Sequence, residues 1–316
     1  MKKLVRTVIA LTALQLWLTP RLCAATSIEV VLSSEADYYQ NVADVFVEQF
    51  VALKPGAPIR RRVLNGDNGL PAVGGQTVVT IGSRATRKAL ARYPEADILA
   101  LLIPMTAWLE LNSQASESRH FAAVVIDQPL ERSVMLGKLL KPDARHFGAV
   151  LGPAAGAIQA SSLERVSAMG LDLHVQKLPP TANPISVLGA MMEVSDVFVA
   201  VPDRADFNRN VAKWLLRLSF RDKVPVIGFS SSYAEAGALA SIYSSPENVG
   251  RHGAELLHKL LEARSPESAS RAADWRAYYS KYYTLQVNED VARVLDITVP
   301  PLDELYRKYR QALRVM

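Results

Sequence analysis

Short apolar segments alternate with longer amphipathic segments along the chain from Ile28 onward. Apolar segments of about four to eight residues are typical of buried strands, and longer segments with helical spacing are typical of the helices that cover a sheet. Strands are predicted at residues 28–32, 59–64, 77–81, 98–103, 121–126, 147–151, 171–177, 197–201 and 224–228. Helices are predicted at residues 38–53, 86–93, 129–140, 158–169, 184–193, 208–221 and 246–263. The alternation predicts the α/β class with parallel sheets, and its two series predict two Rossmann-like units in tandem.

The first 25 residues have the pattern of a secretory signal peptide. Basic residues precede an apolar run at residues 8–18, and small residues end at Ala25. This run is much shorter than the about 20 apolar residues that a membrane-spanning helix needs. We therefore expect cleavage after Ala25 and export of a soluble mature chain to the periplasm.

Cys23 lies within this leader and is the single cysteine of the chain. Lipid attachment at Cys23 is not expected, because Pro20, Arg21 and Leu22 stand where a lipoprotein signal needs small residues. The mature chain then has no cysteine, which excludes both a disulfide framework and a thiol nucleophile.

The charge of the chain argues against a nucleic-acid partner. The formal net charge is +5, and four of the cations lie in the leader, which leaves +1 (5 minus 4) on the mature chain. Residues 60–62 form the compact basic run Arg-Arg-Arg, which we interpret as a solvated strand edge or loop in preference to a phosphate-binding patch.

Motifs of catalysis and of cofactor binding are missing. The sequence has no GxxxxGK phosphate loop followed by Ser or Thr, and no GxSxG nucleophile motif. His252 and His258 are six residues apart, so on one helix they point to different faces and do not form a metal pair. We expect no enzyme activity, no cofactor and no metal site.

Hydroxyl and charged residues follow several of the predicted strands. In open α/β sheets the carboxyl ends of the strands are where ligands bind. In the first unit, Ile81 and Gly82 end a strand before Ser83, which could cap a helix whose amino terminus attracts an anion, and Arg84 could add a charge. An ordinary N-cap with an exposed arginine is the alternative. The candidates here are Ser33, Ser34, Tyr38, Ser83, Arg84 and Thr86.

In the second unit Asp203 follows one strand, and a polar bend at residues 230–233 follows another. Ser230, Ser232 and Tyr233 of that bend are candidate ligand residues, because aromatic and hydroxyl groups suit a small ligand with an apolar body and few polar ends. Tyr243 is a candidate to close over such a ligand, and a buried hinge tyrosine is the alternative.

Several motifs occur in an order that resembles a known family. They are VPVIGF at residues 224–229, AGALAS at 236–241 and Gly250-Arg251 opening a helix, together with Asp127-Gln128-Pro129 before Arg132, FGAVLGP at 147–153, Leu285-Gln286-Val287-Asn288 and Val291-Ala292. Residues 120–300 in particular resemble the ABC-transporter substrate-binding proteins of the tryptophan/tyrosine-binding type, which have the type I periplasmic binding protein fold.

The resemblance implies two lobes with a three-segment hinge. The crossings fall at 127–129, where a proline ends a strand, and near 242–244 and 282–284. Residues 26–127 plus about 244–282 would form the first lobe, and 128–243 plus about 283–300 the second, followed by a C-terminal helix at 301–316. The hinge residues would be Asp127, Gln128, Tyr243 and Tyr283.

The function implied by the resemblance is capture of a small molecule between the lobes and its delivery to an inner-membrane ABC permease. The ligand would be an amino acid or a related carboxylate, with Ser83 and Arg84 on the acid and Tyr38 or Tyr233 facing the body. Residues 33–39, SSEADYY, depart from the pattern expected in amino-acid-binding relatives, which leaves the ligand open. The alternative is a periplasmic sensor or adaptor of the same fold that acts on a membrane receptor or kinase. In either role we expect a monomer.

Overall fold

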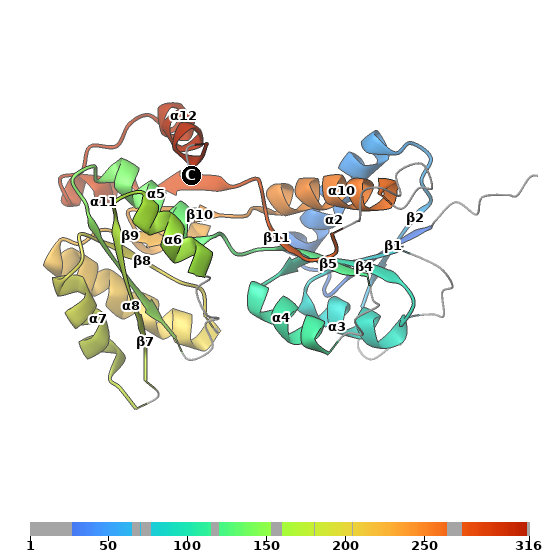
Figure 1. Ribbon diagram of the computed structural model, residues 1–316, viewed down its shortest axis with the longest axis horizontal. Helices are drawn as coiled ribbons and strands as arrows, with labels where there is room; N and C mark the ends of the chain where they lie inside the picture. Colours follow the sequence, from blue (N-terminus) through green and yellow to red (C-terminus); the bar gives the residue numbers. More distant parts are fainter. Residues whose placement is uncertain are drawn as a thin grey trace, which may run out of the picture.

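The computed structural model divides into two lobes, each built on a six-stranded sheet (Figure 1). It describes residues 27–64, 70, 77–114, 120–152, 160–179, 181–203, 205–263 and 274–314, and the side chains of these residues except 160 and 205–209. The predicted leader at residues 1–25, with Cys23, lies outside the described residues. The α/β class with two lobes of mainly parallel sheets, expected from the sequence, is confirmed.

The sheet of the first lobe has six parallel strands in the order β11-β5-β4-β3-β1-β2. Most of these strands are apolar and buried, as the sequence predicts. The two edge strands differ from this pattern: β2 carries three exposed arginines, and β11 is half-buried. The strands are β1 (Ile28–Leu32), β2 (Ile59–Val63), β3 (Thr77–Ile81), β4 (Asp97–Ile103), β5 (Phe121–Val125) and β11 (Ala277–Tyr279).

Helix α10 comes late in the chain and packs on the first lobe, against α2 (Figure 1). Two glycines on one face of α10 make this close packing possible. A Cβ at Gly250 would lie 2.8 Å from the carbonyl oxygen of Val42, and one at Gly253 would lie 2.6 Å from Leu101 Cδ2. The helices of this lobe are α2 (Asp37–Leu53), α3 (Ser83–Arg92), α4 (Met105–Ser113) and α10 (Pro246–Glu262).

The sheet of the second lobe has the order β12-β10-β9-β8-β6-β7, with β12 antiparallel to β10 and the other pairs parallel. Its strands are β6 (His146–Leu151), β7 (Asp172–Lys177), β8 (Val197–Val199), β9 (Val226–Gly228), β10 (Ala240–Tyr243) and β12 (Thr284–Val287). Its helices are α5 (Leu130–Leu140), α6 (Ala160–Ala168), α7 (Pro184–Glu193), α8 (Ala205–Asp222), α9 (Ser231–Ala236), α11 (Glu289–Val294) and α12 (Leu302–Leu313). In the part of the chain that is described, no helix combines the length and the apolar character needed to cross a bilayer.

The expected polar bend at residues 230–233 is instead the start of a short helix, α9. Ser230 is its N-cap, and its Oγ accepts a hydrogen bond from the amide of Tyr233 at 3.3 Å. Gly237 ends the helix with a φ of +123°, a conformation that side chains with a Cβ rarely adopt. A capping serine and a terminating glycine seven residues apart are the signals that identify this helix.

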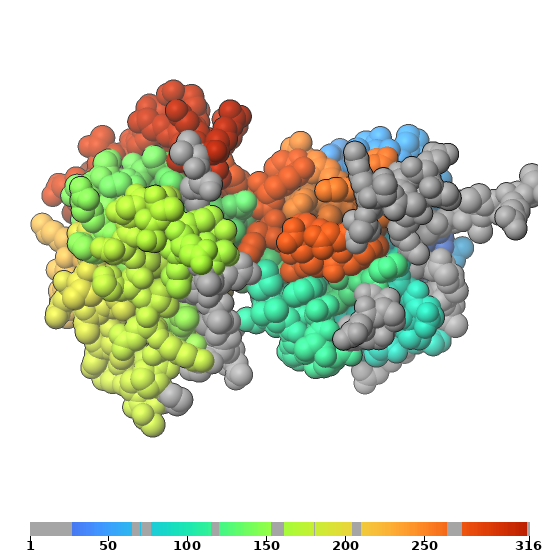
Figure 2. Space-filling view, viewed as in Figure 1, coloured from blue at the N-terminus to red at the C-terminus, as the bar shows by residue number. Residues whose placement is uncertain are grey.

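The chain passes between the two sheets three times. It leaves the first sheet after β5, returns to the first lobe after β10, and enters the second sheet again between β11 and β12. The carboxyl ends of β4 and β5 therefore face those of β8 and β9 across the connection between the lobes, which Figure 2 shows as a zone narrower than either lobe.

Candidate ligand-binding cleft

A cavity of about 110 Å³ lies between the two lobes. Its wall comes from residues that follow β4 and β5 in the first lobe, from residues that follow β8 and β9 in the second, and from α5, α6 and β11. These positions are the carboxyl ends of strands in both sheets, which is where α/β sheets bind ligands. We call it the interlobe cavity; its lining residues are Met105, Thr106, Leu109, Asp127, Gln128, Leu130, Ser133, Ser162, Ala200, Val201, Pro202, Phe229 and Tyr279.

Asp127 is the charged residue among the described residues of this wall. Its Oδ2 accepts a hydrogen bond from the amide of Met105 at 2.6 Å, which fixes the carboxyl group at the first turn of α4. Burial raises the pKa of Asp127, and the Met105 amide opposes this shift by favouring the charged form. Burial and the nearby Asp127 raise the pKa of Tyr279 to about 12, so this phenol keeps its proton at neutral pH. A carboxyl group beside a phenol can accept from an ammonium or a hydroxyl group of a ligand.

Arg132, in the first turn of α5, connects the three crossing segments. Its Nη1 donates to Gln128 Oε1 at 2.6 Å and to the carbonyl oxygen of Ser280 at 2.7 Å. Gln128 Nε2 in turn donates to Ser244 Oγ at 2.7 Å. The Tyr283 ring lies 5.8 Å from the guanidinium carbon, within the range of a cation–π contact. Gln128 and Tyr283, predicted as hinge residues, thus belong to one network, and we call it the hinge network.

Most of the first-lobe candidates gather at the carboxyl ends of β1 and β3, which are neighbouring strands. Ser83 does not cap the following helix as expected; it is the first residue of α3, and the N-cap is Gly82. Ser33 Oγ accepts from the amide of Ala85 at 2.8 Å and so caps this helix from the neighbouring strand. Gly82 makes the approach possible, because a Cβ there would lie 2.7 Å from Ser33 Oγ.

The other first-lobe candidates have partners inside the lobe or lie at its surface. Arg84 Nη2 donates to the carbonyl oxygen of Leu64 at 2.7 Å. The hydroxyl of the fully buried Thr86 bonds to Gly82 and Thr80, which leaves it no hydrogen for a ligand. Ser34 Oγ accepts from the amide of Ala36, and the Tyr38 side chain is exposed. None of these residues is part of the described wall of the interlobe cavity.

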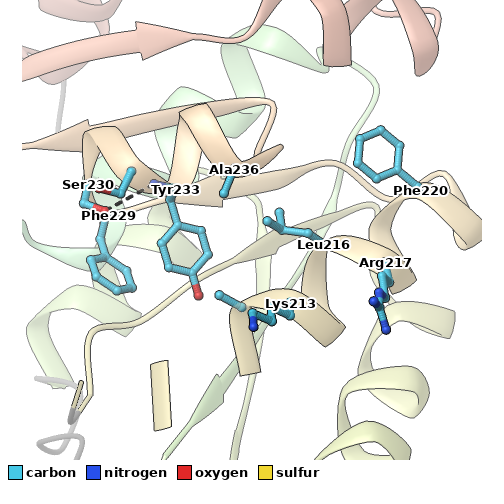
Figure 3. Close-up of a pocket in the computed structure, with 10 residues that line it drawn as sticks. Lys213, Leu216, Arg217, Phe220, Phe229, Ser230, Tyr233 and Ala236 are labelled. Carbon is cyan, nitrogen blue, oxygen red and sulfur yellow. Dashed lines mark hydrogen bonds between the residues drawn. The ribbon is translucent and has the colours of Figure 1, made fainter. Parts of the chain in front are cut away.

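The second-lobe candidates separate into two groups. Asp203 directly follows Val201 and Pro202, which line the interlobe cavity. Ser230, Ser232 and Tyr233 line a different pocket, which lies within the second lobe between α8 and α9 (Figure 3).

The predicted hinge residue Tyr243 makes a bond within the second sheet. It lies on β10, and its hydroxyl donates to Gln286 Oε1 on β12 at 3.2 Å. The Tyr243 side chain is therefore held on the second lobe and is absent from the described wall of the interlobe cavity.

Several cavity residues were not predicted as ligand residues from the sequence. Thr106 and Phe229 follow β4 and β9, so the rule that ligands bind at the carboxyl ends of strands applies to them as well. Asp127 was predicted as a hinge residue and also lines the cavity. Tyr279 gives no local signal, because it reaches the cavity only through the pairing of β11 with β5.

Comparisons with known proteins agree with this architecture. A family model described as ABC transporter substrate binding protein matches residues 78–306. No curated protein matches the chain. Three similar solved structures share 20% identity or less with the chain, so they establish the fold alone.

A ligand-free, open substrate-binding protein with adhesive properties from Clostridium difficile superposes with a TM-score of 0.64 at 18% identity, covering 88% of this chain and 97% of that one. An ABC domain in complex with L-Trp from Streptococcus pneumonia gives a TM-score of 0.54 at 16% identity, covering 89% and 98%. A conserved domain protein from Vibrio cholerae gives 0.52 at 20% identity, covering 87% and 96%. The chain belongs to the family of ABC transporter substrate-binding proteins and has the fold of type I periplasmic binding proteins.

Proposed function

We propose that this protein captures a small molecule in the interlobe cavity, in the periplasm, and delivers it to an ABC importer of the inner membrane. The observation that carries the proposal is that one cavity is formed by the carboxyl ends of strands from both lobes, beside a hinge of three segments. A ligand that contacts both walls binds the closed arrangement more tightly than the open one and so stabilises it. The closed, loaded form would be what the permease recognises.

The ligand we favour is an amino acid or a related carboxylate. Asp127 would accept from its amino group, and Tyr279 would donate to a polar atom beside it. Apolar residues of both lobes, such as Leu109 and Phe229, would contact the side chain. This combination of an apolar wall and a few polar groups is typical of small-molecule sites.

Ser83 and Arg84 remain our proposal for the ligand carboxylate. β4 separates β3 from β5, so the ends of β3 and β5 lie about 10 Å apart, at two strand spacings. An amino acid whose amino group is bound at Asp127 would have its carboxylate far from Arg84. To reach that carboxylate, the guanidinium of Arg84 would have to leave the carbonyl oxygen of Leu64 and turn across β4. The long arginine side chain makes such a movement possible during closure.

A thermal-shift screen of residues 26–316 against amino acids, small carboxylates, sugars, nucleosides and purines tests this proposal, after any bound ligand is removed by unfolding and refolding. A ligand at 100 times its dissociation constant adds about 2.7 kcal/mol, which raises the melting temperature by several degrees. Asp127→Asn should abolish the shift for a ligand with an amine, and Arg84→Ala should reduce it for a carboxylate. Asp290→Asn, which removes the same charge from an exposed position, is the matched control.

Two outcomes would contradict the proposal in different ways. An unchanged shift in Asp127→Asn would remove Asp127 from the site while leaving capture intact. A protein that unfolds cooperatively and shifts with no compound would argue against capture, and a docking role on a membrane receptor or kinase would then explain the chain better.

A further inference from the structure

The second lobe contains a pocket of about 590 Å³ that is separate from the interlobe cavity. One face of α8 forms its floor, with residues spaced one helical turn apart, and α9 with the segment before it forms the opposite wall (Figure 3). We call it the α8–α9 pocket; its described lining residues are Ala212, Lys213, Leu216, Arg217, Phe220, Phe229, Ser230, Ser232, Tyr233 and Ala236. Phe229 lines both cavities and so forms part of the wall between them.

The wall of this pocket is mainly apolar and aromatic. Leu216 and Phe220 lie on α8, and the rings of Phe229 and Tyr233 lie 4.8 Å apart on the opposite side. Phe220 is exposed although it is apolar. A concave apolar wall of this size suits an aromatic or acyl group of a small molecule.

Two cations stand on the same wall. Lys213 and Arg217 are four residues apart on α8, so their side chains lie on one face. Within the described part of the chain neither one forms an ion pair, and the guanidinium carbon of Arg217 lies 5.1 Å from the centre of the Trp214 ring. Two neighbouring cations without an acidic partner attract an anion.

The hydroxyl of Tyr233 adds a donor. The Tyr233 side chain is 8% exposed, and among the described residues its hydroxyl has no hydrogen-bond partner. In Figure 3 its ring points from α9 toward α8. Burial raises the pKa of Tyr233 to about 12, so the phenol stays protonated and can donate a hydrogen bond.

We propose that the α8–α9 pocket is a second binding site, for an organic anion with an aromatic or acyl body. The body lies against Leu216, Phe220 and Phe229. The acidic group lies between Lys213 and Arg217 and accepts from Tyr233. This site goes beyond the proposed capture function, because it lies within one lobe and needs no closure.

Fluorescence titrations with two probes of the same skeleton test the proposal. 8-Anilinonaphthalene-1-sulfonate is an aromatic anion, and N-phenyl-1-naphthylamine is the same molecule without the sulfonate. The purified protein should bind one molecule of the sulfonate and should bind the neutral probe more weakly. The variant Lys213→Gln/Arg217→Gln should weaken sulfonate binding by at least about tenfold, as expected for loss of charge-assisted hydrogen bonds, and should change the neutral probe by less than about twofold.

The control variant is Arg307→Gln/Lys308→Gln, which removes two charges from exposed positions on α12 of the same lobe. It should leave both affinities unchanged. Leu216→Trp, which fills the pocket, should abolish binding of both probes, provided that the variant unfolds cooperatively. Because Lys213 and Arg217 are exposed, the charge variant tests the site without depending on the buried substitution.

Two results would overturn the proposal. One is a sulfonate affinity that is the same in the wild type and in Lys213→Gln/Arg217→Gln. The other is a loss of sulfonate binding in Asp127→Asn that equals the loss in the charge variant, because this would place the probe in the interlobe cavity. If the α8–α9 pocket binds neither probe, the thermal shifts caused by the captured ligand are unaffected. The two proposals can therefore be refuted independently.

Discussion

A buried histidine on α10 should make the stability of this protein depend on pH between 4 and 6.5. His252 is 9% exposed, and its Nδ1 accepts from the amide of Lys281 at 3.3 Å. The rings of Tyr278 and Tyr282 lie almost perpendicular to the imidazole, with ring centroids 6.5 Å from it. Burial is the main cause that lowers the pKa of His252 to about 4. The positive charges of Lys281 and Arg132 lower this pKa further, and the negative charge of Glu255 opposes the shift.

The sign and size of the effect follow from the two pKa values. The histidine pKa is about 6.5 in the unfolded chain, so between pH 6.5 and 4 the unfolded state binds a proton that the folded state does not bind. The free energy of unfolding is therefore highest above pH 6.5 and falls as the pH is lowered. One pKa unit corresponds to about 1.4 kcal/mol, so the loss between pH 7.5 and pH 5 is about 2 kcal/mol and approaches roughly 3 kcal/mol at pH 4.

Urea unfolding of the wild type and of His252→Gln at pH 7.5 and at pH 5 measures this loss. The wild type should lose about 2 kcal/mol more than the variant between these pH values, because other titrating groups are common to both proteins. His258→Gln, on the same helix but on another face, is the matched control and should lose as much as the wild type. An equal loss in the wild type and in His252→Gln would refute the reasoning.

Four further predictions concern close contacts and the hinge network. Gly250→Ala should destabilise the protein by about 1 to 3 kcal/mol in urea unfolding, because the new methyl group meets the backbone of α2. Gly189→Ala on α7, where the new methyl group meets no atom within 4 Å, should instead stabilise it by about 0.5 to 1 kcal/mol, and a loss there would contradict the packing argument. Gly82→Ala should cost roughly 2 to 4 kcal/mol, because it combines a φ of +90° with a Cβ 2.5 Å from the Tyr39 ring; an unchanged denaturation midpoint would be the contrary result. Arg132→Leu should cost about 3 kcal/mol in the same assay, because Gln128 and the carbonyl oxygen of Ser280 lose their charged donor, and a cost below about 1 kcal/mol would show that the hinge network is not coupled to stability.

Many of the strands and helices could be predicted because their signals are local, whereas short elements such as β11 and β12 were not predicted. Apolar strands such as residues 28–32 and 77–81 are followed by serine or glycine, and the next helices bury one face and leave the other exposed. The site could be predicted only in part, because its geometry depends on distant partners. Arg84 follows a strand end, as a ligand residue would, but the carbonyl oxygen of Leu64 determines where its guanidinium lies.

The separation of the two pockets could not be predicted either. Ser230 and Tyr233 follow the carboxyl end of β9, which places them near the connection between the lobes. The packing of α9 opposite α8 then determines which cavity receives the tyrosine ring, and no local pattern in the sequence specifies that packing. The sequence places Ser230 and Tyr233 side by side, but it does not specify which of the two cavities they line.

The late position of α10 and β11 in the chain has a consequence for how the protein folds. The face of α2 that carries Val42 and Phe46 is covered by α10, and β5 has β11 as its neighbour at the sheet edge. During synthesis, residues 27–125 emerge first but cannot complete their core until residues 246–279 have followed. Most of the second lobe is one continuous segment and is made between these two parts of the first lobe. The first lobe can therefore be completed only after most of the second lobe has been made. Until α10 has been made, the apolar face of α2 has no partner, so the first lobe stays incomplete through most of synthesis.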